Sequence, residues 1–222
     1  MGNPSSLSPV IHKEIRAVLW DFGGVILSSP FEAFNRYETA SGLPLDHIRR
    51  VNSTNPDGNA WALLERNDIS PLEFDALFAT ESEALGHRIP GADVLALLSG
   101  DVRPAMVAAL DHVIASGYRT ACLTNNVVST TPDPSPRQIE VAAIMNKFDH
   151  VVESSKVGCR KPEPRFYEIA CELVGVSPDE CVFLDDLGVN LKPAAAMGMR
   201  TIKVGDPTIA LQELSDHLGL QF

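Results

Sequence analysis

The strongest constraint on the fold is an apolar run that ends on an aspartate and two glycines. Residues 17–20 are apolar throughout, Asp21 follows them directly, and Gly23 and Gly24 come shortly after. Strands that are apolar on both faces are typical of parallel sheets covered by helices on both sides. In open sheets of this kind, ligands bind beyond the carboxyl ends of the strands. The run therefore predicts an α/β fold with Asp21 at the functional edge of the sheet.

The chain after residue 103 alternates between helix-like and strand-like segments. We expect strands at 119–123, 150–153, 181–184 and 200–204, and helices that end near 116 or begin near 136, 164, 190 and 207. Alternation of this type gives a parallel sheet with helices on both faces. Together with a first strand at about 16–20, it predicts a Rossmann-like core.

Residues 30–100 contain no strand-like run. Amphipathic segments separated by Gly, Pro and Asn occupy about 31–40, 59–66, 71–85 and 92–98, which predicts a helical insert. Residues 1–14 are rich in Ser and Pro and lack periodicity, so we expect a mobile leader there. The predicted organisation is a leader at 1–14, a core domain at 15–29 and 101–222, and a helical domain at 30–100.

Three further segments end on side chains that suit phosphate chemistry. They lead to Thr124 and Asn125, to Lys161, and to the adjacent pair Asp185 and Asp186. The carboxyl ends of parallel strands share one edge of the sheet, so these side chains can meet Asp21 there. A carboxylate, a hydroxyl, a cation and a carboxylate pair are the groups that phosphoryl transfer uses.

Asp21 and Thr124 each allow a purely structural alternative. A carboxylate can attack phosphorus and form an aspartyl-phosphate, but an aspartate after a strand can also cap a turn. The Thr124 hydroxyl and the Asn125 amide suit phosphate oxygens, but either side chain can cap a helix. The presence of the other motifs favours catalysis for Asp21 and phosphate contact for Thr124 and Asn125.

The pair Asp185 and Asp186 predicts a metal ion. Adjacent carboxylates at a strand end repel each other unless a cation is present, and Mg²⁺ accepts carboxylates together with water and phosphate oxygens. The segment 158–164 offers two cations, Arg160 and Lys161, and the proline after Lys161 favours an extended backbone there.

The four motifs, in this order and at these separations, resemble the haloacid dehalogenase-like (HAD) hydrolase superfamily from about residue 17 to 204. Residues 183–194 are similar to the N-terminal phosphatase domain of soluble epoxide hydrolases, and residues 21–25 to HAD domains attached to some acyl-CoA dehydrogenases. The resemblance implies a HAD-like core and makes the helical insert a C1 cap that closes over the active site. It also selects Lys161, directly before the proline, so we expect Arg160 on the surface.

The resemblance assigns roles to the candidate residues. It makes Asp21 the nucleophile, makes Thr124 and Lys161 catalytic, and assigns substrate binding to Thr124, Asn125 and Lys161.

The resemblance also supplies a metal site. Mg²⁺ is expected on Asp21, Asp186 and the carbonyl of Gly23, with Asp185 in a water-mediated or outer contact. Asn190 either orients Asp186 or Lys161, or caps the helix that follows it.

Gly23 departs from the pattern of the superfamily. That position usually carries a second Asp, which protonates the leaving oxygen and then activates water. The carbonyl survives the change to glycine, but the general acid does not. General acid–base catalysis contributes about 10²- to 10⁴-fold, so we expect slow turnover of alkyl phosphates.

The predicted function is a Mg²⁺-dependent phosphatase that hydrolyses a small phosphate ester through an aspartyl-phosphate. One alternative is a 2-haloacid dehalogenase, which the paired carboxylates disfavour because they would repel a carboxylate substrate. The other is a HAD protein that binds a phosphorylated ligand but has weakened catalysis, which the loss of the acid at Gly23 suggests.

The composition of the chain limits the kinds of molecule that it is expected to bind. The net charge of −11 argues against nucleic acid, because binding it requires clustered Lys and Arg. No apolar stretch reaches 18 residues and no secretion signal precedes the first strand, so a cytoplasmic protein without a membrane contact is expected. We expect a monomer or homodimer with a small phosphorylated metabolite as its partner.

Overall fold

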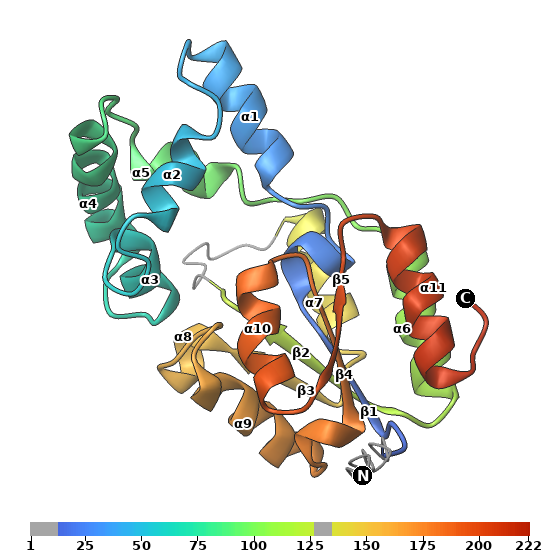
Figure 1. Cartoon of the computed structure of the whole chain (residues 1–222). Helices are drawn as coiled ribbons and strands as arrows, with labels where there is room; N and C mark the ends of the chain where they lie inside the picture. The colour runs from blue at the N-terminus through green and yellow to red at the C-terminus, as the bar shows by residue number, and fades with distance from the viewer. Residues whose placement is uncertain (1–12, 127–134) are drawn as a thin grey trace, which may run out of the picture.

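The computed structural model describes residues 13–126 and 135–222. Within them, five parallel strands form one sheet in the order β3-β2-β1-β4-β5 (Figure 1). The strands are β1 (Ala17–Trp20), β2 (Arg119–Thr124), β3 (His150–Glu153), β4 (Cys181–Asp185) and β5 (Arg200–Lys203). The predicted α/β class with a parallel sheet is confirmed. The predicted leader at 1–14 lies almost wholly outside the described residues.

Strand β1 occupies the centre of the sheet, and this position accounts for its apolar sequence. Leu19 lies opposite Ala121 on β2 and Phe183 on β4. Because successive side chains of a strand point to opposite faces, Val18 and Trp20 enter one buried cluster while Leu19 enters the other. Both faces are therefore core, as in other parallel sheets.

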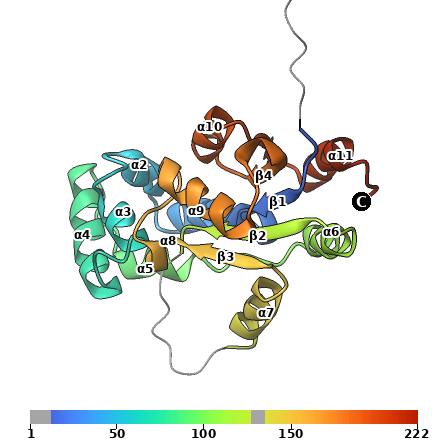
Figure 2. The same cartoon turned by 90° about the horizontal axis from the view of Figure 1, so that it is seen from below.

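Helices cover both faces of the sheet. The bounds are α6 (Pro104–Ala115), α7 (Pro136–Met145), α8 (Ser154–Val157), α9 (Pro164–Val174), α10 (Gly188–Ala196) and α11 (Pro207–Leu218), with a short 3₁₀ turn at Pro178–Glu180. Side chains of α6, α7 and α11 pack on one face, and side chains of α9 and α10 on the other. Figure 2 shows α7 and α9 on opposite sides of β2 and β3.

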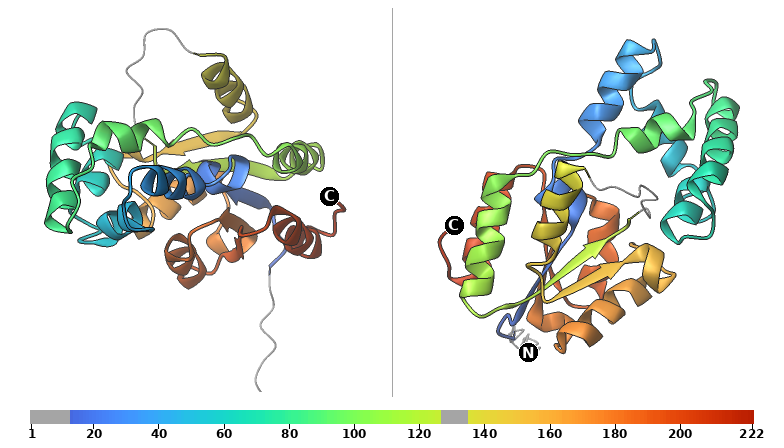
Figure 3. Two further views of the ribbon diagram at one scale, coloured as in Figure 1. Left: turned by 90° about the horizontal axis from the view of Figure 1, so that it is seen from above. Right: turned by 180° about the vertical axis from the view of Figure 1, so that it is seen from behind.

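The helical insert (residues 30–100) stands beyond the carboxyl ends of the strands (Figure 3). Its helices are α1 (Phe31–Ala40), α2 (His47–Ser53), α3 (Ala60–Glu65), α4 (Pro71–Ala84) and α5 (Gly91–Ala96). They enclose a hydrophobic cluster of their own, in which the Phe74 ring lies 5.3 Å from Phe78 and 5.4 Å from Trp61. The division of the chain into the predicted domains stays a prediction.

Local sequence sets where the long helix of the insert begins. The Ser70 side chain accepts a hydrogen bond from the Glu73 backbone, and the Glu73 carboxylate accepts one from the Ser70 backbone. Pro71 occupies the first helical position, where its missing N–H costs nothing. None of the helices in the described part of the chain has the length and apolar character needed to cross a membrane.

Truncating Phe78 tests the cluster of the insert. Phe78 is fully buried, so Phe78→Ala should lower the free energy of unfolding by about 3–5 kcal/mol through lost burial and a cavity. Leu72, on the same helix, is 80% exposed, and Leu72→Ala should change it by no more than about 0.5 kcal/mol. Urea denaturation measures both, and equal losses in the two variants would show that the insert has no ordered core.

Candidate active site

Asp21 is held at the end of β1 by backbone contacts. Its N–H donates to the carbonyl of Leu184 at 2.8 Å, which extends the sheet by one residue. Its Oδ1 accepts from the N–H of Phe22 at 2.7 Å. The side chain is therefore fixed at the carboxyl edge of the sheet, where the sequence predicted it.

The two glycines after Asp21 do different work. Gly24 has φ +81°, and a Cβ there would lie 2.2 Å from Oδ2 of Asp186, so only glycine lets the two loops approach. Gly23 has φ −70° and ψ 131°, with open space where its Cβ would be. Only Gly24 is required by the backbone, and a larger residue fits at position 23.

Lys161 joins two of the strand ends. Its Nζ lies 2.7 Å from Oδ1 of Asp21 and 2.8 Å from Oδ2 of Asp185, and its side chain is 1% exposed. Lys161 enters from the segment before α9, whereas the aspartates end β1 and β4. One buried ammonium thus joins three segments that are distant in the sequence.

Asp185 is saturated by contacts inside the protein. Its Oδ1 accepts from the Leu187 N–H at 2.8 Å, and the Asn190 amide donates to both carboxylate oxygens at 3.0 and 3.1 Å. Lys161 also donates to Oδ2, so both oxygens of this carboxylate are occupied by contacts within the protein. Asn190 was expected to orient Asp186 or Lys161, or to cap the helix that follows it. The structure places its amide on Asp185, the last residue of β4, so it reaches Lys161 only through that carboxylate.

Asp186 is more open than its neighbour. Its Oδ2 accepts a hydrogen bond from the Ser29 hydroxyl at 3.2 Å. Ser29 ends the segment that leads from β1 into the helical insert. Nothing in the sequence pattern singled out this serine, because its contact is formed only when two segments 157 residues apart come together.

Burial and neighbouring carboxylates raise the pKa values of Asp21 and Asp186. Burial raises the pKa of Asp21 well above its ordinary value; Lys161 opposes the rise, and Asp185 and Asp186 add to it. Burial, reinforced by Asp185, raises the pKa of Asp186 to about 6. For Lys161, burial lowers the pKa, but Asp185 and Asp21 more than offset this, so the lysine stays charged.

The donor set fits a divalent cation. Oxygen atoms from Asp21, Asp185 and Asp186 all lie within 4.8 Å of one another. Three ionised carboxylates against the one ammonium of Lys161 leave a net charge of −2 in a largely buried space. Oxygen donors of this kind suit Mg²⁺. Because the hydrogen bonds of Asp185 are already taken, Asp21 and Asp186 are the carboxylates available to such an ion.

Thr124 and Asn125 follow each other at the end of β2 but are used differently. The Thr124 hydroxyl has no hydrogen-bond partner among residues 13–126 and 135–222. The Asn125 amide donates to the Lys161 carbonyl at 3.0 Å and to Oε2 of Glu65 at 3.2 Å. Both amide hydrogens of Asn125 are thereby occupied. Its contact with substrate stays a prediction, and the backbone N–H is the donor that could make it.

Arg160 does not lie on the surface as expected. Its side chain is 13% exposed, and its Nε lies 2.6 Å from Oε2 of Glu65 in the helical insert. Arg103, where the chain returns from the insert, donates to the Gly24 carbonyl at 2.6 Å. Sequence reasoning missed the roles of Glu65 and Arg103, because both depend on how the insert meets the core.

Removing the ammonium of Lys161 tests the cluster. Lys161→Met leaves buried carboxylates without their cation and should lower the free energy of unfolding by about 3–5 kcal/mol near pH 8. Asp21 has a higher pKa folded than unfolded, so its proton stabilises the fold at low pH and this contribution is lost as pH rises. The deficit should therefore be smaller at pH 5. Urea denaturation at both pH values measures it, with the exposed Lys192→Met as control; a deficit independent of pH would contradict the electrostatic origin.

Comparison with known proteins places the chain in a family. The pattern of the haloacid dehalogenase-like hydrolases matches residues 15–198. The chain is 33% identical over 215 residues to acyl-CoA dehydrogenase family member 10 of Mus musculus, covering 93% of this chain and 19% of that protein. It is 32% identical over 220 residues to bifunctional epoxide hydrolase 2 of Mus musculus, covering 94% and 40%. The chain thus spans less than half the length of these two relatives.

Shorter relatives and solved structures agree. A phosphatase of Mycobacterium tuberculosis is 32% identical over 202 residues, which cover 86% of this chain and 87% of that protein. A HAD family enzyme of Bacteroides thetaiotaomicron, in complex with magnesium and inorganic phosphate, has the same fold, with a TM-score of 0.56 and 22% identity over 86% of this chain and 96% of that one. The chain belongs to the haloacid dehalogenase-like hydrolases.

Proposed function

We propose that this hydrolase is a Mg²⁺-dependent phosphatase of small phosphate esters that works through an aspartyl-phosphate on Asp21. The observation that carries the proposal is the buried cluster in which Lys161 bridges Asp21 and Asp185 beside the more open Asp186. The 32% identical phosphatase of Mycobacterium tuberculosis supports the choice of reaction.

Asp21 has one carboxylate oxygen available for the attack. Its Oδ1 is held by Lys161 and by the Phe22 N–H, whereas Oδ2 has no hydrogen-bond partner within the described residues. Attack of Oδ2 on phosphorus forms the acyl phosphate bond and breaks the ester P–O bond. Water then attacks the same phosphorus, which releases inorganic phosphate and restores the carboxylate.

Lys161 and Thr124 are proposed to hold the phosphoryl group. The ammonium of Lys161 lies against the nucleophile and can stabilise negative charge that develops on the phosphoryl oxygens. The free hydroxyl of Thr124 can donate to another of these oxygens. Both side chains are buried, and the Lys161 ammonium is already held by two carboxylates, so it needs little reorganisation in the transition state.

The metal would be held by Asp21, Asp186 and the carbonyl of Gly23. When bound, Mg²⁺ supplies charge neutralisation for the substrate phosphate and for the carboxylates around it. Asp185 would not bind the ion directly, because its carboxylate accepts hydrogen bonds from Lys161 and Asn190.

At the two positions considered for it, residues 23 and 185, no side chain of the described chain is free to protonate the leaving oxygen. Gly23 has no side chain, and Asp185, which stands nearby, is saturated by Lys161, Asn190 and the Leu187 N–H. We propose water as the donor. We therefore expect the enzyme to prefer esters whose leaving group needs no protonation, such as aryl or acyl phosphates.

Hydrolysis of p-nitrophenyl phosphate tests the proposed function. The wild type should turn over with Mg²⁺ and lose activity on chelation with EDTA, and Asp21→Asn should be inactive because an amide is a poor nucleophile. Activity that survives EDTA, together with release of halide from a 2-haloacid, would favour a dehalogenase. Binding of phosphate without turnover above the Asp21→Asn background would favour a HAD protein that only binds its ligand.

Restoring the missing acid tests the role of position 23. The open space and ordinary φ of Gly23 should let Gly23→Asp fold normally. This variant should hydrolyse an alkyl phosphate about tenfold faster or more than the wild type, with a smaller gain on p-nitrophenyl phosphate. Gly23→Asn is the matched control, because its amide has a similar shape but no acidic proton. Equal kcat of the wild type on alkyl and aryl phosphates would contradict the absence of an acid.

A further inference from the structure

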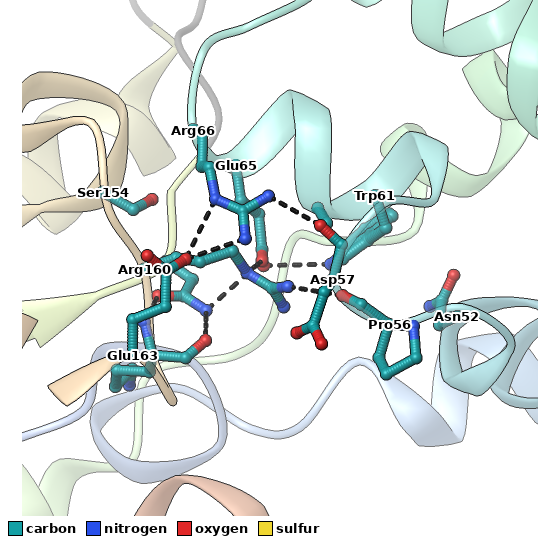
Figure 4. Close-up of polar contacts among 12 residues, drawn as sticks. Asn52, Pro56, Asp57, Trp61, Glu65, Arg66, Ser154, Arg160 and Glu163 are labelled. Atoms are coloured by element: carbon teal, nitrogen blue, oxygen red, sulfur yellow. Dashed lines mark hydrogen bonds and ion pairs between the residues drawn. The ribbon is translucent and has the colours of Figure 1, made fainter.

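Two crossed ion pairs join the helical insert to the segment that carries Lys161 (Figure 4). Glu65 and Arg66 are adjacent at the end of α3, and Arg160 and Glu163 flank the Lys161–Pro162 step. Arg160 Nε lies 2.6 Å from Glu65 Oε2, and Arg66 Nη2 lies 2.8 Å from Glu163 Oε1. In one pair the insert supplies the carboxylate, and in the other it supplies the guanidinium. Both pairs join the insert to the same short segment.

The two pairs differ in burial. The side chains of Glu65 and Arg160 are 8% and 13% exposed, whereas those of Glu163 and Arg66 are 35% and 17% exposed. Breaking a buried pair leaves an uncompensated charge and is far more costly than breaking an exposed one. The Glu65–Arg160 pair is therefore the stronger determinant of how the insert sits.

Glu65 accepts from donors on three sides. Its Oε1 accepts from the Trp61 indole N–H at 2.9 Å, and its Oε2 accepts from the Asn125 amide at 3.2 Å beside the Arg160 guanidinium. Burial raises the pKa of Glu65, and Arg160, Trp61 and Lys161 oppose the rise. An ionised carboxylate accepts hydrogen bonds at both oxygens. A glutamine here would place its NH₂ group against one of the N–H donors, and that hydrogen bond would be lost.

The side chain of Asn125, which Glu65 contacts, also forms hydrogen bonds with the backbone of Lys161. Its Oδ1 accepts from the Lys161 N–H at 2.9 Å, and its amide donates to the Lys161 carbonyl at 3.0 Å. The side chain of Asn125 thus grips both polar groups of the backbone of one residue, and its remaining amide hydrogen is fixed by Glu65. A continuous path of hydrogen bonds runs from α3 of the insert to the lysine that contacts Asp21.

We propose that Glu65 is a positioning residue: it fixes Asn125, which sets the backbone of Lys161, so the catalytic lysine is placed correctly only while the helical insert is seated on the core. The role given to Lys161 rests on the proposed function. The path itself is a property of the fold and can be tested without any reaction.

The kinetic test compares Glu65→Gln with Arg66→Gln. Each variant breaks one ion pair between the insert and the core, but only Glu65 touches Asn125. With Mg²⁺ and p-nitrophenyl phosphate, Glu65→Gln should lower kcat about tenfold with KM changed less than about threefold, because misplacement of a catalytic group acts mainly on the chemical step. Arg66→Gln should keep kcat within about twofold. Equal losses of kcat in both variants would overturn the proposal.

A double variant tests the route through Asn125. Because Glu65 is proposed to act by fixing Asn125, Glu65→Gln/Asn125→Ala should have the same kcat as Asn125→Ala alone. Losses that multiply in the double variant would show that Glu65 acts independently of Asn125, which would overturn the route.

Hydrogen exchange of the Lys161 backbone N–H, followed by NMR, tests the path without catalysis. That N–H donates to Asn125, so its exchange should be about tenfold faster in Glu65→Gln and unchanged in Arg66→Gln. If the wild type shows no phosphatase activity, the proposed function fails while this measurement still decides the path. Should Glu65→Gln not fold, Trp61→Phe removes one donor to Glu65 and should shift the exchange in the same direction; unchanged exchange in the folded variants would overturn the proposal.

Discussion

The buried ammonium of Lys161 is the contact on which the rest of the site depends. Withdrawing a lysine from water is costly, and only close carboxylates with their own hydrogen bonds can offset that cost. Asp21 and Asp185 supply them at 2.7 and 2.8 Å, from the ends of two neighbouring strands. Because one ammonium contacts both carboxylates at once, the three chain segments are held to a single arrangement.

The charge that remains in the cluster is negative, which suits a cation. One ammonium cannot balance three carboxylates, and burial, reinforced by the neighbouring Asp185, raises the pKa of Asp186 to about 6. The lack of a side chain at Gly24 brings Asp186 close to the loop after β1. A divalent cation beside Asp186 would remove the excess charge that otherwise repels a phosphate ester. Together the three carboxylates of the cluster form a donor set that suits a divalent cation.

The sequence predicted the parts of the site that follow from strand order. Asp21, Thr124, Asp185 and Asp186 each end a parallel strand or follow one directly, so topology alone brings them to one edge. The difference between Gly23 and Gly24 could not be predicted, because it depends on where Asp186 lies. The burial of Arg160 was missed because its partner, Glu65, is in the helical insert. Local patterns carry little information about pairs of this kind, which form only after two separately packed units meet.

The helical insert owes its internal order and its placement to different forces. Its apolar side chains, Phe74 and Phe78 among them, pack with one another in a cluster that contains no residue of the sheet. Toward the segment around Lys161 it presents charged groups instead, Glu65 and Arg66. Apolar burial is not directional, whereas ion pairs and hydrogen bonds require particular partners at particular distances. Apolar packing therefore orders the interior of the insert, whereas directional polar contacts join it to the segment around Lys161.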